Sequence, residues 1–245
     1  MVYRGIKFVY DEPAMVVNAD NEEYLVIGDL HIGMELELSK KGVHLFSATE
    51  NMGKRIIKIM NDFSLTKMIM LGDIKNSILY PEFSEIRLLK EFFDALSKFE
   101  IKIVAGNHDA HLAELIDHEV VKELVVGNFG FLHGNRKPDQ SIMMLDYIIS
   151  AHDHLAVRIK EKNGAIYEQK AWGIYSINKR MAKSSYDKFN EKIKLVSMPA
   201  FNDLIIGTTI EKLSASRMNP LLNSKIFSKN AEIYNTLGQR VSLRR

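Results

Sequence analysis

The feature that most constrains how this chain can fold is a set of five short apolar stretches. Each is followed directly by two residues, one of them Gly or Ala and the other Asp, Asn or His. The stretches occupy residues 24–27, 67–71, 101–105, 130–132 and 147–150. Short apolar runs bounded by glycine are typical of buried strands. Apolar residues at helical spacing lie between the first three of them, at 47–61 and 82–99. This alternation predicts an α/β fold with helices on the faces of a sheet.

The chain after residue 154 has a more β-like pattern. We expect a hairpin across 156–169 that turns at Lys162-Asn163-Gly164, and a last hairpin across 231–243. Residues 204–207 read as a buried strand, and the Lys-rich segment 179–192 as either a helix or a loop. The sequence has no internal repeat or clear linker, so one domain is expected for residues 1–245.

Composition excludes several classes of protein. Cysteine is absent from the 245 residues, so disulfides and thiolate metal ligands are excluded. No apolar run approaches the roughly 20 residues that a membrane span needs, and residues 1–7 lack a signal-peptide core. We therefore expect a cytoplasmic protein that has no contact with a membrane.

Charge is divided unevenly along the chain. Residues 1–154 contain 16 Lys or Arg against 24 Asp or Glu, a net charge of −8, and residues 155–245 contain 17 against 7, a net charge of +10. The acidic part suits cations and the basic part suits a polyanion such as DNA or RNA. The alternative is that the Lys residues form a solvated face.

The polar residues after the apolar runs have the chemistry of metal ligands. They include Asp29, His31, Asp73, Asn107, His133, His152 and His154. Because alternate residues of a strand point the same way, Asp29 and His31 can converge on one ion. Carboxylate, amide and imidazole groups together suit first-row cations, and a carboxylate can bridge two of them, for which Asp73 is the natural candidate. Two such ions can polarise a phosphoryl group and activate a hydroxide.

As an ordered set, these motifs resemble the calcineurin-like metallophosphoesterase signature. The resemblance covers residues 28–154: Asp-x-His, Gly-Asp, Gly-Asn-His-Asp, His, and a final His-x-His that here follows Ala151 instead of the usual Gly. It implies a four-layer αββα sandwich that binds two divalent ions, with Mn²⁺ expected first and Fe, Ni, Co or Zn as alternatives.

The resemblance also implies a role for each residue. The first ion would be held by Asp29, His31, Asp73 and His154, and the second by Asp73, Asn107, His133 and His152. His108 would be the catalytic histidine that protonates the leaving oxygen after attack by a hydroxide that bridges the two ions. Asp109 would orient His108 and raise its basicity.

The later part of the chain narrows the resemblance. Trp172, residues 198–202 and Gly207 are similar to a compact prokaryotic and archaeal branch related to the SbcD/Mre11 nucleases. Core packing is the alternative explanation for Trp172 and Phe201. The expected function is hydrolysis of phosphodiester bonds in nucleotides or nucleic acid. A small-molecule cyclic-nucleotide phosphodiesterase, a phosphomonoesterase and a non-enzymatic scaffold with the same fold stay open as alternatives.

Overall fold

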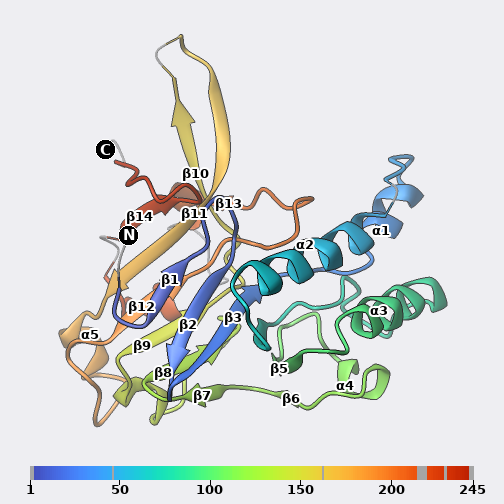
Figure 1. Cartoon of the computed structure of the whole chain (residues 1–245). Helices are drawn as coiled ribbons and strands as arrows, with labels where there is room; N and C mark the ends of the chain where they lie inside the picture. The colour runs from blue at the N-terminus through green and yellow to red at the C-terminus, as the bar shows by residue number, and fades with distance from the viewer. Residues whose placement is uncertain (1–2, 46, 162, 214–219, 229–230, 243–245) are drawn as a thin grey trace.

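Two β-sheets that pack face to face form the centre of the molecule, as the computed structural model shows (Figure 1). The structure describes residues 3–45, 47–161, 163–213, 220–228 and 231–242. The first sheet has the strand order β1-β2-β3-β4-β5-β6. Its strands are β1 (Ile6–Phe8), β2 (Met15–Ala19), β3 (Glu22–Gly28), β4 (Lys67–Leu71), β5 (Glu100–Val104) and β6 (Val120–Val121). Because β3, β4 and β5 run parallel, their carboxyl ends meet at one edge of the sheet.

The second sheet has the order β13-β10-β11-β12-β9-β8-β7, and β14 pairs with β11. Its strands are β7 (Leu124–Val126), β8 (Phe129–Leu132), β9 (Tyr147–Ser150), β10 (Leu155–Lys160), β11 (Ile166–Ser176), β12 (Lys194–Ser197), β13 (Thr208–Thr209) and β14 (Glu232–Asn235). β8 and β9 are parallel, so their carboxyl ends also lie together. The predicted strands before the five polar motifs are therefore confirmed.

Helices complete the outer layers. They are α1 (Met34–Lys40), α2 (Ala48–Asp62), α3 (Phe83–Ala95), α4 (Leu112–Leu115), α5 (Lys179–Ala182), α6 (Ile210–Leu213) and α7 (Pro220–Asn223), with a 3₁₀ turn η1 (Ile142–Met144). The helical spacing in 47–61 places Met52, Ile56 and Met60 of α2 in the core beside the first sheet. The pattern in 82–99 gives a shorter helix than expected, because α3 ends at Ala95.

Three hydrophobic cores separate the layers. One joins α2 and α3 to the first sheet, and a second lies between the sheets and includes Trp172 and Phe131. A third packs η1, Ala182 of α5 and Leu221 of α7 against the second sheet. The expected four-layer αββα sandwich is thus confirmed, although its last layer consists of short helices. Trp172 is buried with its ring edge-on to Phe8, 4.8 Å between centroids, as core packing requires.

The predicted hairpin across 156–169 is confirmed, although β11 continues beyond it to Ser176 and Lys162 of the predicted turn lies outside the described residues. Its register runs from Ala156 opposite Lys170 to Lys160 opposite Ile166, and its outer half projects from the body as an arm (Figure 1). The last hairpin is confirmed in reduced form: β14 turns back at Gly238 and meets the chain again through the bridge between Tyr234 and Arg240. Residue 243, at its expected end, lies outside the described residues.

The expected buried strand at 204–207 is wrong. The side chain of Asn202 accepts a hydrogen bond from the backbone N–H of Leu204 (2.9 Å), and its carbonyl accepts one from Ile205 (3.2 Å). These bonds form a turn that leaves Ile206 exposed. The Lys-rich segment 179–192 begins with the single-turn helix α5 and continues as irregular chain.

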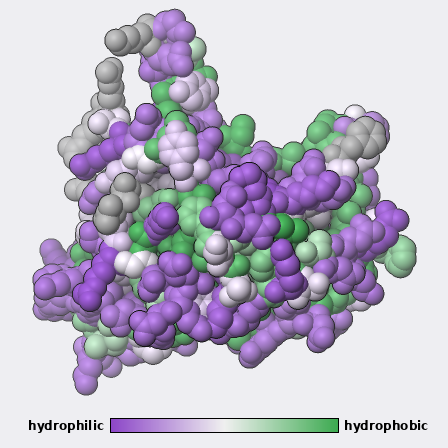
Figure 2. All heavy atoms as spheres, viewed as in Figure 1, coloured by the Kyte–Doolittle hydropathy of each residue, from purple (hydrophilic) through white to green (hydrophobic). Residues whose placement is uncertain are grey.

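The surface is mostly hydrophilic in the view of Figure 2, with hydrophobic residues showing through near the middle of that face. Among the described helices, none is both long and apolar enough to cross a membrane.

Candidate metal centre

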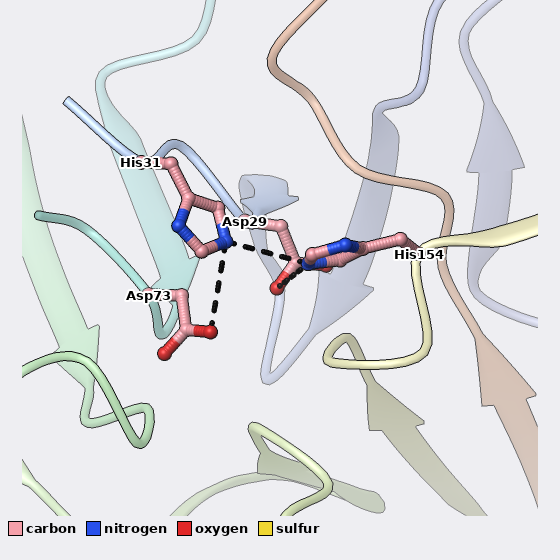
Figure 3. A group of neighbouring side chains, drawn as sticks. All are labelled: Asp29, His31, Asp73 and His154. Atoms are coloured by element: carbon pink, nitrogen blue, oxygen red, sulfur yellow. Dashed lines mark hydrogen bonds and ion pairs between the residues drawn. The ribbon is translucent and has the colours of Figure 1, made fainter. Parts of the chain in front are cut away.

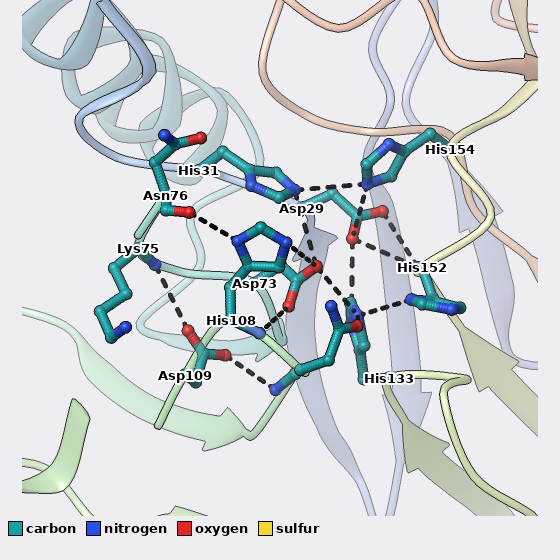
Figure 4. Close-up of polar contacts among 12 residues, drawn as sticks. Asp29, His31, Asp73, Lys75, Asn76, His108, Asp109, His133, His152 and His154 are labelled. Carbon is teal, nitrogen blue, oxygen red and sulfur yellow. Dashed lines mark hydrogen bonds and ion pairs between the residues drawn. The ribbon is translucent and has the colours of Figure 1, made fainter. Parts of the chain in front are cut away.

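The carboxyl ends of β3, β4, β5, β8 and β9 bring the predicted ligands to one place (Figure 4). Asp29, Asp73 and Asn107 follow strands of the first sheet, and His133 and His152 follow strands of the second. The other three histidines lie elsewhere: His44 and His111 are exposed, and His118 packs on Phe93. The sequence therefore distinguished the clustered histidines from the rest.

One group of ligand atoms comes from Asp29, His31, Asp73 and His154 (Figure 3). The Nε2 atom of His154 lies 3.3 Å from Asp29 Oδ1 and 3.4 Å from His31 Nε2. His31 Nε2 lies 3.6 Å from Asp73 Oδ2. All four ligand atoms lie within 4.8 Å of one another, so the group could hold one cation.

A second group comes from Asp73, His133 and His152, with Asn107 beside it. His133 Nε2 lies 3.3 Å from Asp73 Oδ2, 3.2 Å from His152 Nδ1 and 3.2 Å from Asn107 Oδ1. The same oxygen, Asp73 Oδ2, thus faces His31 in the first group and His133 in the second. Among the described residues, Asp73 is the member that the two groups share.

Left-handed backbone at five of the ligand positions aims these side chains. The φ angles are 56° at Asp29, 44° at His31, 49° at Asp73, 71° at His152 and 44° at His154. Non-glycine residues rarely adopt this region, and each instance costs of order 1–2 kcal/mol. Strand alternation, the reason expected from the sequence, is therefore not what makes Asp29 and His31 converge: both lie past the end of β3. Strain of this kind persists where the surrounding structure fixes it, and it gathers at functional sites.

The donor set fits divalent cations. The Nδ1–H group of His133 donates to the Leu71 carbonyl (2.9 Å), so in the neutral ring the lone pair is on the Nε2 atom. That lone pair faces the carboxylate of Asp73 and the amide oxygen of Asn107, both of which are acceptors. A proton or a cation is needed among these atoms. A backbone carbonyl that fixes the histidine tautomer is the usual support of a metal-bound imidazole.

The close packing of these ligand side chains also shifts their pKa values. Burial alone would lower the pKa of His133, but the hydrogen bond to Asp73 and the charges of Asp29 and Asp73 raise it to about 9. Burial alone would raise the pKa of Asp73, but His133 and the backbone N–H of His108 hold it well below its usual range. Burial lowers the pKa of His31 to about 4, which keeps it neutral. The carboxylates are thus ionised and ready to bind a cation.

Asp109 does not contact His108 in the expected way. The Nδ1 atom of His108 lies 2.5 Å from the backbone oxygen of Asn76, and its Nε2 atom lies 4.0 Å from Asp73 Oδ2. The buried carboxylate of Asp109 instead accepts backbone N–H groups from Ile74 (2.8 Å), Lys75 (3.3 Å) and Gly106 (2.8 Å). The predicted direct contact between Asp109 and His108 is therefore wrong. Asp109 joins the loops after β4 and β5, while a backbone carbonyl orients His108.

Replacing Asp109 by alanine should lower the free energy of unfolding by about 2–4 kcal/mol, because three backbone N–H groups lose their acceptor. Thermal unfolding should show a fall in Tm of roughly 5–12 °C. Asp94→Ala, on the exposed side of α3, is the matched control and should change the Tm little. An unchanged Tm for Asp109→Ala would contradict this role.

The segment 198–207 supports the first ligand group from outside. The Phe201 N–H donates to the Gly28 carbonyl (2.9 Å), and the Asn202 side chain donates to the Leu30 carbonyl (2.7 Å). Further along, Gly207 has a φ of +114°, and a Cβ atom there would lie 1.8 Å from the His154 carbonyl oxygen. These residues hold the turns that carry Asp29, His31 and His154. Phe201 itself is fully buried in the core, so packing and support coincide there.

Gly207→Ala should weaken metal binding at the first group roughly tenfold, as loss of ligand support commonly does. The methyl group would push the His154 carbonyl away and move the imidazole with it. Gly238→Ala is a matched control, since Gly238 also has a positive φ, +75°, but open space around its Cβ position. Metal content after dialysis against graded chelator measures the difference. An equal loss of metal in the two variants would show that backbone strain, not the contact with His154, weakens metal binding.

Two charged residues beside the site were missed in the sequence. Lys75 and Glu85 are both buried, Lys75 completely. Lys75 was passed over because it follows the Gly72-Asp73 motif as an ordinary loop residue, and Glu85 because it lies in the first turn of an amphipathic helix. The side chain of Asn76 donates to Glu37 (2.9 Å), and its backbone carbonyl accepts a hydrogen bond from His108 Nδ1.

Two packed sheets with Asp, Asn and His side chains at their shared carboxyl edge define the metallophosphoesterase sandwich as the fold of this chain. The structure is similar to the crystal structure of Pseudomonas putida nuclease MPE, with a TM-score of 0.57 and 15% sequence identity over 95% of this chain and 97% of that chain. At this identity the similarity establishes the fold alone.

Two further solved structures are more distantly similar. They are the phosphoesterase YfcE from E. coli (TM-score 0.35, 14% identity, 60% of this chain and 85% of that chain) and a metallophosphoesterase from Sphaerobacter thermophilus (TM-score 0.33, 14% identity, 89% and 87%). No family model matches the sequence, and no curated protein matches it.

Proposed function

We propose that the chain is a metal-dependent phosphodiesterase that acts on nucleotides or nucleic acid by a two-metal mechanism. One observation carries the proposal: Asp73 Oδ2 lies within 3.6 Å of nitrogen ligands from both groups, His31 in the first and His133 in the second. A shared carboxylate oxygen is what a pair of closely spaced ions requires. We assign Asp29, His31, Asp73 and His154 to the first ion and Asp73, Asn107, His133 and His152 to the second, with Mn²⁺ as the expected metal.

Two divalent ions, when bound, supply Lewis acidity toward the phosphoryl oxygens and lower the pKa of water. The chain's own residues hold the charges and protons around them. The Leu71 carbonyl fixes the direction of the His133 ring, so little reorganisation of this ligand is needed when charge develops on the phosphate. The surrounding aspartates are buried, which strengthens each electrostatic contact.

His108 is assigned as the general acid. Its Nδ1–H is held by the backbone carbonyl of Asn76, which fixes the orientation of the ring. The opposite atom, Nε2, points toward Asp73 and the ligand cluster. Nε2 can therefore pass its proton to the leaving oxygen while Nδ1–H stays bound to Asn76.

A substrate screen tests the proposal. Protein loaded in turn with Mn²⁺, Ni²⁺, Co²⁺, Zn²⁺ or Fe²⁺ is given bis(p-nitrophenyl) phosphate, a phosphomonoester, cyclic nucleotides, and single- and double-stranded DNA and RNA. Hydrolysis of diesters that disappears in Asp73→Ala supports the proposal, because activity from a contaminating hydrolase would survive that substitution. A purified protein that hydrolyses none of these with any metal would favour a scaffold role.

The basic second half supports nucleic acid over a small nucleotide as the substrate. Its net charge of +10 can release counterions from a polyanion, which makes binding fall steeply with salt. We expect DNA or RNA cleavage to weaken strongly between 50 and 200 mM salt, as roughly six or more phosphate contacts would require. Turnover of cyclic nucleotides together with salt-independent activity would favour the small-molecule phosphodiesterase instead.

A further inference from the structure

The loop between β4 and α3 exposes several apolar side chains beside His108. Ile78, Leu79 and Tyr80 have exposed fractions of 58%, 79% and 58%, and Phe83 at the start of α3 is 81% exposed. Single exposed apolar residues are common on proteins. Four of them within six positions form a patch, and such patches mark binding surfaces.

The backbone of this loop is held firmly. The buried ammonium group of Lys75 donates to the carbonyls of Ser77 and Leu79, the latter at 3.0 Å. The buried carboxylate of Glu85 accepts the backbone N–H groups of Asn76 (3.0 Å) and Ser77 (2.9 Å). Each of these buried charges is thus satisfied mainly by the loop that it holds.

Burying two charges is unfavourable unless both are fully hydrogen-bonded. Here the two buried charges, Lys75 and Glu85, fix a loop whose apolar side chains remain in water. The exposed side chains give the folded protein no hydrophobic stabilisation that would offset the cost of burying the charges. A surface that is preorganised in this way loses less entropy when it binds a ligand. The arrangement is therefore better suited to binding than to stability.

A cavity of about 590 Å³ lies against this loop. It is lined by Leu36 and Lys40 of α1, by Ile78, Leu79 and Tyr80, and by His108. Its volume is within the range of pockets that hold a nucleoside-sized group, roughly 300–1,000 Å³. Since His108 lines the cavity and its Nε2 atom also faces Asp73, the cavity borders the proposed metal site.

We propose that this cavity binds the nucleobase of the leaving nucleoside, stacked on Tyr80. The Tyr80 ring is held by an edge contact with His111, 5.9 Å between centroids, which leaves a face for stacking. The inference rests on the proposed function: the group that accepts the proton of His108 is the leaving group, so its base lies on the His108 side. A base enters such a cavity only when it is unstacked, so the substrates are single-stranded or unpaired nucleotides.

Dinucleotides test the proposal because each contains a single phosphodiester bond. Metal-loaded wild type and Tyr80→Leu are compared on a dinucleotide and on matched versions that lack the base at either the first or the second position. For the wild type, removal of the leaving base should raise KM about tenfold, as loss of one stacked base does. Tyr80→Leu should show the same rise on the intact dinucleotide and no further rise on the abasic one, while Tyr80→Phe keeps the wild-type values.

A second measurement does not depend on metal or on turnover. Metal-free protein is titrated with 2-aminopurine riboside, whose fluorescence is quenched by stacking. Tyr80→Leu should weaken this binding about tenfold. Tyr10→Leu is the control, because Tyr10 is also exposed (74%) but lies between β1 and β2, outside this cavity.

The outcomes separate this inference from the proposed function. Dinucleotide hydrolysis that is equal with and without either base, or unchanged in Tyr80→Leu, would overturn the base subsite and leave the phosphodiesterase intact. Binding of the riboside that depends on Tyr80, without hydrolysis of any diester, would support the subsite and count against the phosphodiesterase. Cleavage of duplex as fast as single strand would also overturn the inference.

Discussion

Alanine in place of Asp73 should leave the chain without either metal ion, whereas the wild type is expected to bind two. Asp73 Oδ2 faces nitrogen ligands of both groups, so its loss removes a ligand from each and the negative charge between them. Turnover should fall about a thousandfold or more, because the ions supply several kcal/mol of transition-state stabilisation. Elemental analysis of dialysed protein measures the ions, and diester hydrolysis measures turnover.

Two single-site variants provide the matched comparison. His154→Ala removes a ligand from the first group, and Asn107→Ala removes one that borders the second. Each is expected to lose one ion and to keep the other. Circular dichroism checks that all three variants are folded. Retention of one fully occupied ion in Asp73→Ala would show that Asp73 is not shared.

His108→Ala should keep both metals and lose turnover by about 10²–10⁴-fold, the usual contribution of a general acid. The hydrogen bond that His108 donates to Asp73 comes from its backbone N–H, which alanine retains, so the ligands stay in place. The loss should be greatest for nucleotide substrates, whose alkoxide leaving group needs the proton. It should be smaller for bis(p-nitrophenyl) phosphate, whose phenolate leaves readily without one.

His44→Ala is the control, because His44 is exposed and bonds Ser39 at the far end of α1. An equal loss of rate for good and poor leaving groups would contradict proton donation by His108 and would indicate a role in holding the phosphate. Loss of metal in His108→Ala would contradict the assignment of His108 as a general acid that does not hold metal. It would show that His108 helps to hold the metal ligands in place.

The clustering of the predicted ligands could be foreseen from the sequence because Asp, Asn and His residues follow several of the predicted strands directly. Buried strands leave a clear apolar signal, and the residues that follow them at the sheet edge stand out as Asp, Asn and His. The helices were also predictable, since α2 and α3 bury one face each. Short-range patterns of this kind depend on the residues themselves and not on distant contacts.

The manner in which the site is built could not be read in this way. Left-handed backbone at Asp29 and His154 has only a weak signal in residue type, because Asp and His enter this region more often than other non-glycine residues but adopt it at few of their positions. The role of Asp109 depends on loops after two different strands, and the family resemblance suggested the wrong partner for it. The segment 204–207 is apolar but is bent by the side chain of Asn202, a tertiary effect that periodicity does not capture.

The division of the ligands between the two sheets has a consequence for assembly. Asp29, His31, Asp73 and Asn107 belong to the first sheet, and His133, His152 and His154 to the second. Among the described residues neither sheet alone supplies all the proposed ligands, so tight metal binding would require that the two sheets pack on the core that contains Trp172. Ions that bind the docked form in preference to the unfolded chain pull the equilibrium toward it. The metals would thus act as a cross-link between the two sheets, and the concentration of free metal would set how stable the packing of the sheets is.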